Sequence, residues 1–443
     1  MSNELFIERR ERKSLRMELI FQFNKDDIDK NRLLRSIKKV VENQGALQSI
    51  FFMKNGKYHI KFDKNLYPEI IEKTIKESDY LDYQREIEEH LDFPLNNLMY
   101  KIYIIQTEKS LYFDFFVHHI IIDKMSVNAL IYSLNKTYLN DDIPFKSEDL
   151  FYASLYEYNL KLRNDKKLLK DVKNYYFNNY DLGRSFKGYH IDKDIQQPLN
   201  PTSLFVEKSS PSLRNKIYSI FKGKFAKISM FNLICQLYTL YLYNNMEDNI
   251  PEISYARHGR NLKFYKNSMG CFVINAFINY DFSKNSIKIK DKNYINVQDF
   301  FDSVKKQFDE QKLIVRYINT FEDYDALKSI DNLVRSQAYE VVDIAGETMH
   351  GKFLPEYIFG KKLQENSRNK VLSFVENERK PFVKFFFQNA YSPDGIINVL
   401  MGYSELYKVE SLKKISSLFY KVADTLSDGF LSEDKLIEIK MLS

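Results

Sequence analysis

The spacing of apolar and polar positions predicts strands and helices along the whole chain. The clearest strand is the run from Leu111 to Ile122, whose Phe, Val and Ile residues favour a buried, pleated surface. A helix is predicted directly after it, from Ser126 to Tyr138, with Ser126 as its N-cap. Asn55-Gly56, between two extended runs, predicts a hairpin. Further strands are predicted at about 16–23, 47–53, 58–62, 98–106, 269–275, 382–388 and 396–403, and a short strand that runs into a turn is predicted at 253–260. Further helices are predicted at about 26–45, 80–91, 148–163, 165–180, 211–222, 229–243, 297–312 and 411–427.

The mixture of strands and helices in both halves predicts an α/β or α+β fold with mixed sheets. A chain of 443 residues is longer than one ordinary domain, so two domains or lobes are expected. The polar stretch from Asp181 to Pro201 contains two glycines and two prolines, which is typical of a connection between lobes. We therefore place the lobes at 1–180 and 181–443.

Composition narrows the class of protein. The hydrophobic content of 44% supports a sizeable core. The net charge is +6, but Lys and Glu are interspersed instead of clustered, so no nucleic-acid partner is predicted. The two cysteines, Cys235 and Cys271, form no CxxC pair, as expected of a reduced cytoplasmic protein. The charged N-terminus and the short apolar run from Leu233 to Tyr243 predict neither a signal peptide nor a membrane span.

Two adjacent histidines, His118 and His119, stand near the end of the Leu111–Ile122 run, and Asp123 follows it. Successive side chains of a strand point to opposite faces, so the two histidines are expected to serve different spaces. One interpretation is a pair of buried core histidines. The other is a catalytic base at a strand end, with Asp123 fixing the turn behind it. The pattern alone leaves both interpretations open.

The segment His118-His119-Ile120-Ile121-Ile122-Asp123 resembles the HHxxxDG signature of the condensation domains of nonribosomal peptide synthetases, within the chloramphenicol acetyltransferase superfamily. Ser126 falls where that family often has serine. Three further segments resemble motifs of the family in the family's order, and the resemblance covers the chain from about residue 16 onward. They are Leu47-Gln48-Ser49-Ile50-Phe51, His258-Gly259-Arg260, and Gly270-Cys271-Phe272-Val273, which is similar to the start of the family's GxFVN segment.

Three positions depart from the family pattern. Lys124 stands at the glycine of the signature, and it would be strained if that position required a positive φ. Ile274 stands where the family usually has Asn, and Asn275 stands where Thr is common. These departures bear on substrate range and on activity.

The resemblance implies two chloramphenicol acetyltransferase-like lobes that form a V-shaped pseudo-dimer with a tunnel between them. It also implies that His119 deprotonates or orients an attacking amine. His118 is expected to have a structural role on the opposite face, because successive side chains of a strand alternate. Asp123 resembles the family aspartate that pairs with an arginine, for which we choose Arg260. No metal and no bound cofactor are implied. Candidate tunnel or motif positions are Lys124, Ser126, Gly270, Ile274 and Asn275.

The function implied is that of a stand-alone condensation enzyme in nonribosomal peptide biosynthesis, an acyltransferase that joins an acyl or aminoacyl thioester to an amine through an amide bond. The phosphopantetheine arm of a carrier protein would hold the thioester. The sequence contains no adenylation, carrier or thioesterase motif, so carrier proteins are expected in trans, and the amine is carrier-bound or soluble. The alternatives are an acyl-coenzyme A-dependent acyltransferase and a non-catalytic scaffold or docking protein, and ester formation stays open.

Overall fold

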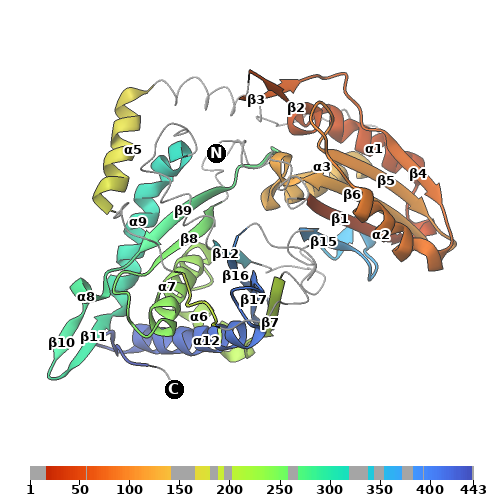
Figure 1. Ribbon diagram of the computed structural model, residues 1–443. Coiled ribbons are helices and arrows are strands. Elements are labelled where there is room, and N and C mark those ends of the chain that lie inside the picture. Colours follow the sequence, from red (N-terminus) through yellow and green to blue (C-terminus); the bar gives the residue numbers. More distant parts are fainter. Residues whose placement is uncertain are drawn as a thin grey trace. The chain divides into compact units, whose positions relative to one another are not determined.

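The structure is a computed structural model (Figure 1). It describes residues 16–55, 57–140, 165–179, 188–193, 202–257, 268–318, 338–343, 354–371, 383–392 and 394–441. Three predicted features lie outside these residues: the helix at 148–163, most of the connection at 181–201, and Arg260. Within the described part of the chain, no helix combines the length and the apolar character needed to cross a membrane.

A five-stranded sheet forms mainly from the first part of the chain, in the order β15-β1-β6-β5-β4 (Figure 1). β4 runs parallel to β5, and the other neighbouring strands are antiparallel. All nine residues of β6 are buried, so this strand is covered on both faces. The strands of this sheet are β1 Arg16–Asn24, β4 Ile70–Thr74, β5 Tyr100–Gln106, β6 Ser110–His118 and β15 Arg368–Val371. The helices of the same part are α1 Lys30–Glu42, α2 Tyr80–His90 and α3 Lys124–Leu139, with the short 3₁₀ helices η1 Lys25–Asp27, η2 Gly45–Gln48, η3 Glu77–Asp79 and η4 His119–Ile121. Two separate strand pairs are β2 Ser49–Lys54 with β3 Lys57–Phe62, and β13 Tyr357–Ile358 with β14 Lys361–Lys362.

The two faces of this sheet differ in polarity because β1 alternates polar and apolar residues, apart from Ile20. The polar face lies against α2, where Gln84 donates a hydrogen bond to the buried carboxylate of Glu18. On the apolar face, the ring of Phe23 packs against Phe359, which in turn packs against Tyr138 of α3. α1 packs against α3 on the same side. The histidine segment therefore follows a strand that is enclosed by a polar layer on one side and an apolar core on the other.

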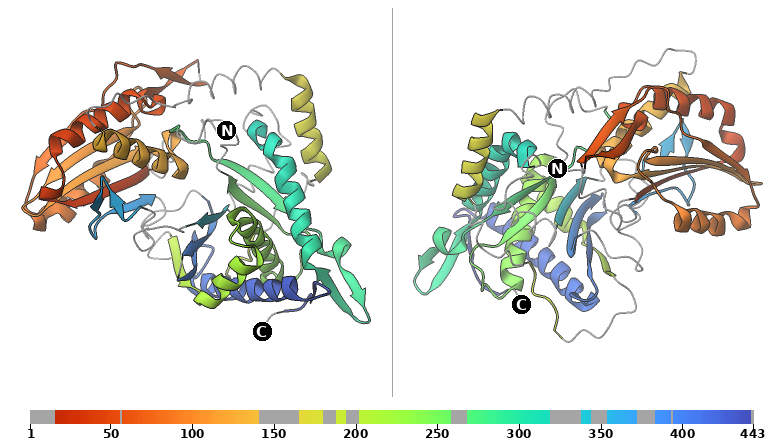
Figure 2. Two further views of the ribbon diagram at one scale, coloured as in Figure 1. Left: turned by 180° about the vertical axis from the view of Figure 1, so that it is seen from behind. Right: turned by 45° about the horizontal axis from the view of Figure 1, so that its top comes forward.

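A six-stranded sheet forms from the later part of the chain, in the order β7-β17-β16-β12-β8-β9. Its strands are labelled in Figure 1, and Figure 2 gives two further views of the same elements. β12 is parallel to both of its neighbours, and the other pairs are antiparallel. The apolar helix α7 is buried almost all round and packs against α9 and α12. The strands of this sheet are β7 Thr202–Lys208, β8 Glu252–Arg257, β9 Ile274–Asn279, β12 Ala338–Asp343, β16 Phe385–Ser392 and β17 Gly395–Tyr403. The helices are α5 Lys166–Asn179, α6 Pro211–Ile220, α7 Phe225–Tyr243, α8 Phe282–Asn285, α9 Val297–Ile318 and α12 Val409–Leu431. A small sheet consists of β10 Ile287–Ile289, β11 Lys292–Asn296 and β18 Leu436–Glu438.

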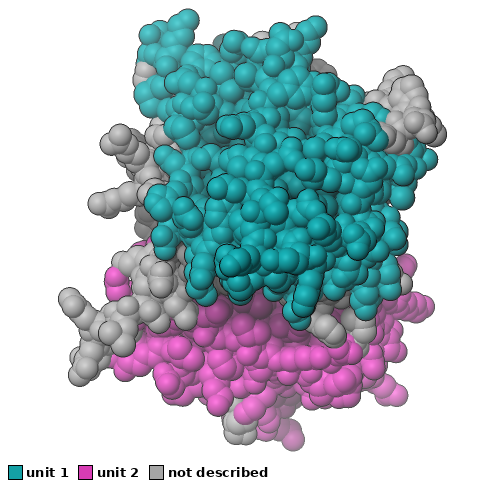
Figure 3. Space-filling model, turned by 90° about the vertical axis from the view of Figure 1, so that its right-hand side faces the viewer, with its two compact units in different colours: residues 1–169, 258–273, 346–375 teal, residues 170–257, 274–345, 376–443 magenta. Residues whose placement is uncertain are grey.

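The chain divides into two compact units, each with its own hydrophobic core (Figure 3). Unit 1 comprises residues 1–169, 258–273 and 346–375, and unit 2 comprises the rest. The sequence placed a single boundary between residues 180 and 181. The structure differs because two later segments return to unit 1, where β15 pairs with β1 and Met269 joins the core.

The α/β character with mixed sheets is confirmed by the described elements. The predicted hairpin is found where β2 pairs with β3, with Lys54 opposite Lys57. The strand predicted at 269–275 begins only at Ile274, so the residues just before it are not part of a sheet. Those residues instead take part in the site described next.

Candidate active site

His118 is the last residue of β6, and its side chain is fully enclosed. It lies on the sheet face covered by α2, because it stands opposite Arg16, which donates a hydrogen bond to the carbonyl oxygen of Leu91 (2.7 Å) just after α2. The Nδ1 atom of His118 accepts a hydrogen bond from the N–H of Ile120 (3.1 Å), and Phe93 meets the imidazole ring edge-on. These contacts hold the His118 ring in place inside unit 1.

His119 begins the 3₁₀ turn η4, so β6 ends one residue before it. The predicted strand to Ile122 was too long, because an apolar run does not distinguish a strand from a turn whose side chains are also buried. The side chain of His119 is partly exposed, unlike that of His118. The two histidines do have different surroundings, but the turn at the strand end separates them, not the alternation of side chains within one strand.

Asp123 is the N-cap of α3, since its Oδ1 atom accepts a hydrogen bond from the N–H of Ser126 (2.8 Å). Ser126 had been predicted to be the N-cap, but it is the third residue of the helix, and its Oγ atom also lies 2.8 Å from Asp123 Oδ1. Lys124 is the first helical residue. Its backbone is therefore helical, and the strain considered for a lysine at this position does not arise.

Asp123 and Ser126 also hold a segment that comes much later in the sequence. The hydroxyl of Ser126 donates to the carbonyl oxygen of Gly270 (2.7 Å) and accepts from the N–H of Gly270 (3.0 Å). The Oδ2 atom of Asp123 accepts from the N–H of Phe272 (2.9 Å). Gly270 has a φ of 152°, which favours glycine. We call Asp123, Ser126, Gly270 and Phe272 the Asp123 frame.

Cys271 lies between the two residues that the Asp123 frame anchors. Its Sγ atom is 3.6 Å from Nδ1 of His119, and both side chains are partly exposed. From the sequence, Cys271 is predicted to be a reduced cysteine within a family-like motif segment, but it is not among the predicted site residues. The order of the family motifs was the signal that could have placed the Gly270-Cys271 segment near the histidines.

Three predicted site residues are not brought to this cluster by the described structure. Ile274 and Asn275 begin β9, where they pair with Arg257 and Ala256 of β8 in unit 2, and their side chains lie outside the described part. Arg260, the expected partner of Asp123, also lies outside it. The structure thus unites His119, Asp123, Ser126 and Gly270 within unit 1, and it adds Cys271 and Phe272.

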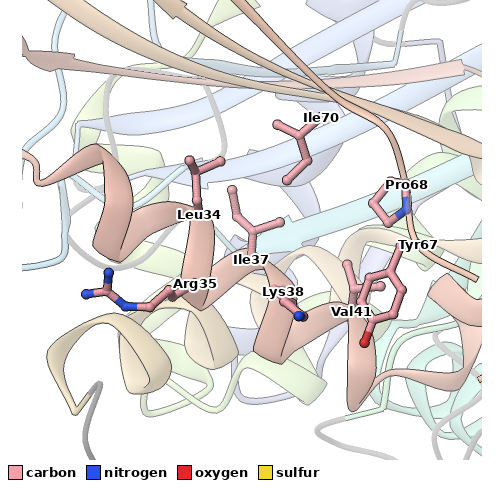
Figure 4. Close-up of a pocket in the computed structure, with 8 residues that line it drawn as sticks. All are labelled: Leu34, Arg35, Ile37, Lys38, Val41, Tyr67, Pro68 and Ile70. Carbon is pink, nitrogen blue, oxygen red and sulfur yellow. The ribbon is translucent and has the colours of Figure 1, made fainter. Parts of the chain in front are cut away.

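A separate pocket of about 290 Å³ lies between α1 and the chain that leads into β4. Figure 4 shows the apolar side chains of Leu34, Ile37 and Ile70 around it, and Arg35 and Lys38 also line it. None of the candidate catalytic residues lines this pocket. It is therefore distinct from the cluster around His119.

Comparison with known proteins gives one family match and many fold matches. The family model described as Condensation domain matches residues 8–175. No curated protein sequence matches the chain. The solved condensation domain from Monacolin K polyketide synthase is similar with a TM-score of 0.73 and 10% identity, covering 97% of this chain and 94% of that chain.

Solved domains with other names are similar to the same extent. The epimerization domain from the third module of tyrocidine synthetase B has a TM-score of 0.70 and 12% identity, covering 95% of this chain and 94% of that chain. The X-domain from teicoplanin biosynthesis has a TM-score of 0.71 and 12% identity, covering 100% and 95%. The predicted chloramphenicol acetyltransferase-like fold is confirmed. Because differently named domains share it, the activity must be argued from the site.

Proposed function

We propose that this chain, which matches the condensation-domain family over residues 8–175 and has the fold of condensation domains, is an amide-forming acyltransferase. Its donor is an acyl or aminoacyl thioester on the phosphopantetheine arm of a carrier protein that acts in trans. Its acceptor is an amine, either carrier-bound or soluble. The product belongs to nonribosomal peptide biosynthesis.

The observation that carries the proposal is the placement of His119. Its imidazole is partly exposed at the end of a fully buried strand, and the turn that bears it leads directly into the Asp123 frame. An imidazole so placed accepts the proton that an amine loses as the new C–N bond forms. General-base help of this kind contributes about 10²–10⁴-fold, and the rest of the acceleration comes from positioning the two substrates.

Two alternatives differ from the proposal, one in the donor that it consumes and the other in consuming no donor. An acyl-coenzyme A-dependent acyltransferase of the same fold would need no carrier protein. A scaffold or docking protein would bind a carrier protein without transferring its acyl group. Donor specificity and product formation together therefore separate the three functions.

The experiment is to incubate carrier proteins loaded with acyl or aminoacyl groups with candidate amines, and to follow the products by intact-protein mass spectrometry. His119→Ala is expected to slow amide formation about 10²–10⁴-fold while the protein stays folded, because only the base is removed. His90→Ala is the matched control, since His90 is an exposed histidine at the end of α2. It is expected to leave the rate unchanged.

Undiminished turnover by the His119→Ala protein would contradict the role of His119. Acylation from acetyl-coenzyme A, with none from any loaded carrier protein, would favour the first alternative. Binding of carrier protein without any product would favour the docking alternative.

A further inference from the structure

We propose that the thiol of Cys271 accepts the acyl group from the donor thioester and passes it on to the amine, with His119 as the base that activates the thiol. This inference rests on the proposed function and adds a covalent acyl-enzyme to it. Its starting point is the distance of 3.6 Å between Cys271 Sγ and His119 Nδ1. A thiol in hydrogen-bond contact with an imidazole is the arrangement by which enzymes generally activate a cysteine nucleophile.

The surroundings of Cys271 are those of a reactive thiol and differ from those of the other cysteine. Cys271 and His119 are both partly exposed. Cys235 is completely buried in α7, and this burial raises the pKa of its thiol well above the ordinary value. Reactive cysteines are partly exposed beside a basic group, whereas structural cysteines are enclosed and inert. Of the two cysteines, Cys271 alone meets both conditions.

The chain is anchored on both sides of Cys271, which holds its backbone in place beside His119. Gly270 is bound through its N–H and its carbonyl oxygen to the hydroxyl of Ser126, and Phe272 is bound through its N–H to Asp123. Asp123 and Ser126 are completely buried, so solvent does not compete for these bonds. The Asp123 frame therefore holds the backbone of Cys271 where its thiol contacts His119, and a nucleophile on a fixed backbone loses less freedom when it reacts.

The first chemical step transfers the acyl group from one thiol to another. His119 takes the proton of Cys271, and the thiolate attacks the carbonyl carbon of the donor thioester. The bond between that carbon and the phosphopantetheine sulfur breaks, and the leaving thiolate takes the proton from His119. One thioester replaces another, so no oxidant, reductant or further reactant is required.

The second step forms the amide. The amine attacks the acyl carbon on Cys271, the C–N bond forms, and the bond to Sγ breaks. His119 takes the proton that the amine loses and returns it to the Cys271 thiolate, which restores the resting enzyme. The same imidazole serves both steps because it lies beside the sulfur at which the acyl group is held.

The first test measures the thiol–imidazole pair without any substrate. The folded protein is treated with iodoacetamide at pH 7, and alkylation of each cysteine is followed by peptide mass spectrometry. Cys271 is expected to react at least about tenfold faster than it does in His119→Ala, because the imidazole increases the thiolate fraction. Cys235 serves as the internal control and is expected to stay unmodified until the protein unfolds. Equal rates for Cys271 in the two proteins would overturn the inference.

The second test looks for the acyl-enzyme itself. The protein is mixed with pantetheine thioesters of acetate, octanoate and phenylalanine in the absence of an amine. A mass gain of one acyl group is expected on the peptide that contains Cys271, and none is expected in Cys271→Ala. Addition of the amine should then discharge the adduct at least as fast as the overall turnover. No adduct from any of the three donors, or an adduct that the amine does not discharge, would overturn the inference.

The third test separates this inference from the proposed function. With a loaded carrier protein as donor, Cys271→Ala is expected to form amide at least about tenfold more slowly than the unaltered protein, because it has lost the nucleophile. Cys271→Ser, which keeps nearly the same size, is expected to be slow as well, and it guards against an effect of misfolding in Cys271→Ala. Amide formation at the full rate in Cys271→Ala would exclude a covalent role for Cys271 and leave the proposed function intact.

Discussion

Asp123 joins two segments of unit 1 that are distant in the sequence. One carboxylate oxygen caps α3, and the other accepts a hydrogen bond from the N–H of Phe272. A carboxylate at a helix N-terminus is also favoured by the helix dipole. The expected pairing with Arg260 stays a prediction, since that residue lies outside the described part of the chain. The described contacts of Asp123 position the backbone around His119 and Cys271.

We expect Asp123→Ala and Ser126→Ala each to lower the free energy of unfolding by about 1–3 kcal/mol, because each leaves buried polar groups without partners. The double variant should lose less than the sum, since the two side chains share hydrogen bonds. Urea unfolding of the two single variants and the double variant measures this. Asp123→Ala combined with Ser133→Ala, farther along α3, is the control and should be additive. Additive losses for Asp123 and Ser126 would show that the two act independently.

The sequence supplied His119, Asp123, Ser126 and Gly270 as candidates, but it did not supply the contact between His119 and Cys271. His119 and Cys271 are 152 residues apart, and their contact depends on the hydrogen bonds of the Asp123 frame. Apolar periodicity carries no information on such contacts, whereas the order of family motifs indirectly does. The sequence also could not show the backbone conformation of Lys124. The structure shows that Lys124 is the first residue of a helix, so a lysine is not strained there.

At the scale of elements, the sheet of unit 1 is fixed at both ends by polar contacts. His118 occupies one end of β6, and Glu77 in η3 binds the other end. Glu77 accepts hydrogen bonds from the hydroxyl groups of Thr107, Ser110 (3.2 Å) and Tyr112 (2.9 Å) at the turn between β5 and β6. Burial alone would raise the pKa of Glu77, but these hydrogen bonds outweigh it and lower the pKa.

Glu77→Gln is expected to destabilise the protein at pH 7 and to have little effect in acid. A carboxylate whose pKa is lowered on folding adds stability above its ordinary pKa of 4.5, and this stability is lost as the pH falls through the folded pKa. Thermal unfolding of both proteins between pH 3 and pH 7 measures the difference. Glu69→Gln, at an exposed carboxylate, is the charge control. A difference between Glu77→Gln and the unaltered protein that stays constant down to pH 3 would contradict the linkage.

At the scale of the whole molecule, composition makes a prediction about association. Carrier proteins are typically acidic, and this chain has a net charge of +6. If the proposed function holds, binding of a carrier protein should weaken as salt increases, since exposed charges are screened beyond about 8 Å at physiological ionic strength. Calorimetric titration at low and high salt measures the effect. Equally strong binding at both would indicate an apolar docking surface.

The number of units could be predicted from the chain length, but their composition could not. The sequence pattern predicts no strand at 368–371, and it does not show that this segment pairs with β1, more than 340 residues earlier. Four core residues of unit 1, Leu354, Ile358, Phe359 and Leu363, come from the same late segment. A single boundary at a polar connection assumes that no later segment belongs to the first unit. Here two later segments, 258–273 and 346–375, belong to unit 1.

The return of the chain predicts that residues 1–180 do not form a stable lobe by themselves. This fragment lacks β15, which leaves an edge of β1 without its partner strand, and it lacks Met269 and the four core residues of the late segment. Burial of an apolar side chain contributes about 1.5–3 kcal/mol, so five such residues represent roughly 8–15 kcal/mol. That amount is comparable with the whole free energy of unfolding of an ordinary domain, about 5–15 kcal/mol.

We therefore expect the 1–180 fragment to show no cooperative thermal transition, whereas the full chain shows one. Near-ultraviolet circular dichroism of the tyrosines measures this, since the chain has 32 tyrosines and no tryptophan. Addition of a peptide that spans residues 346–375 should restore part of the signal, because it supplies β15 and four of the five missing core residues. A scrambled peptide of the same composition is the control. A fragment that unfolds cooperatively near the melting temperature of the full chain would show that the later segments are dispensable for unit 1.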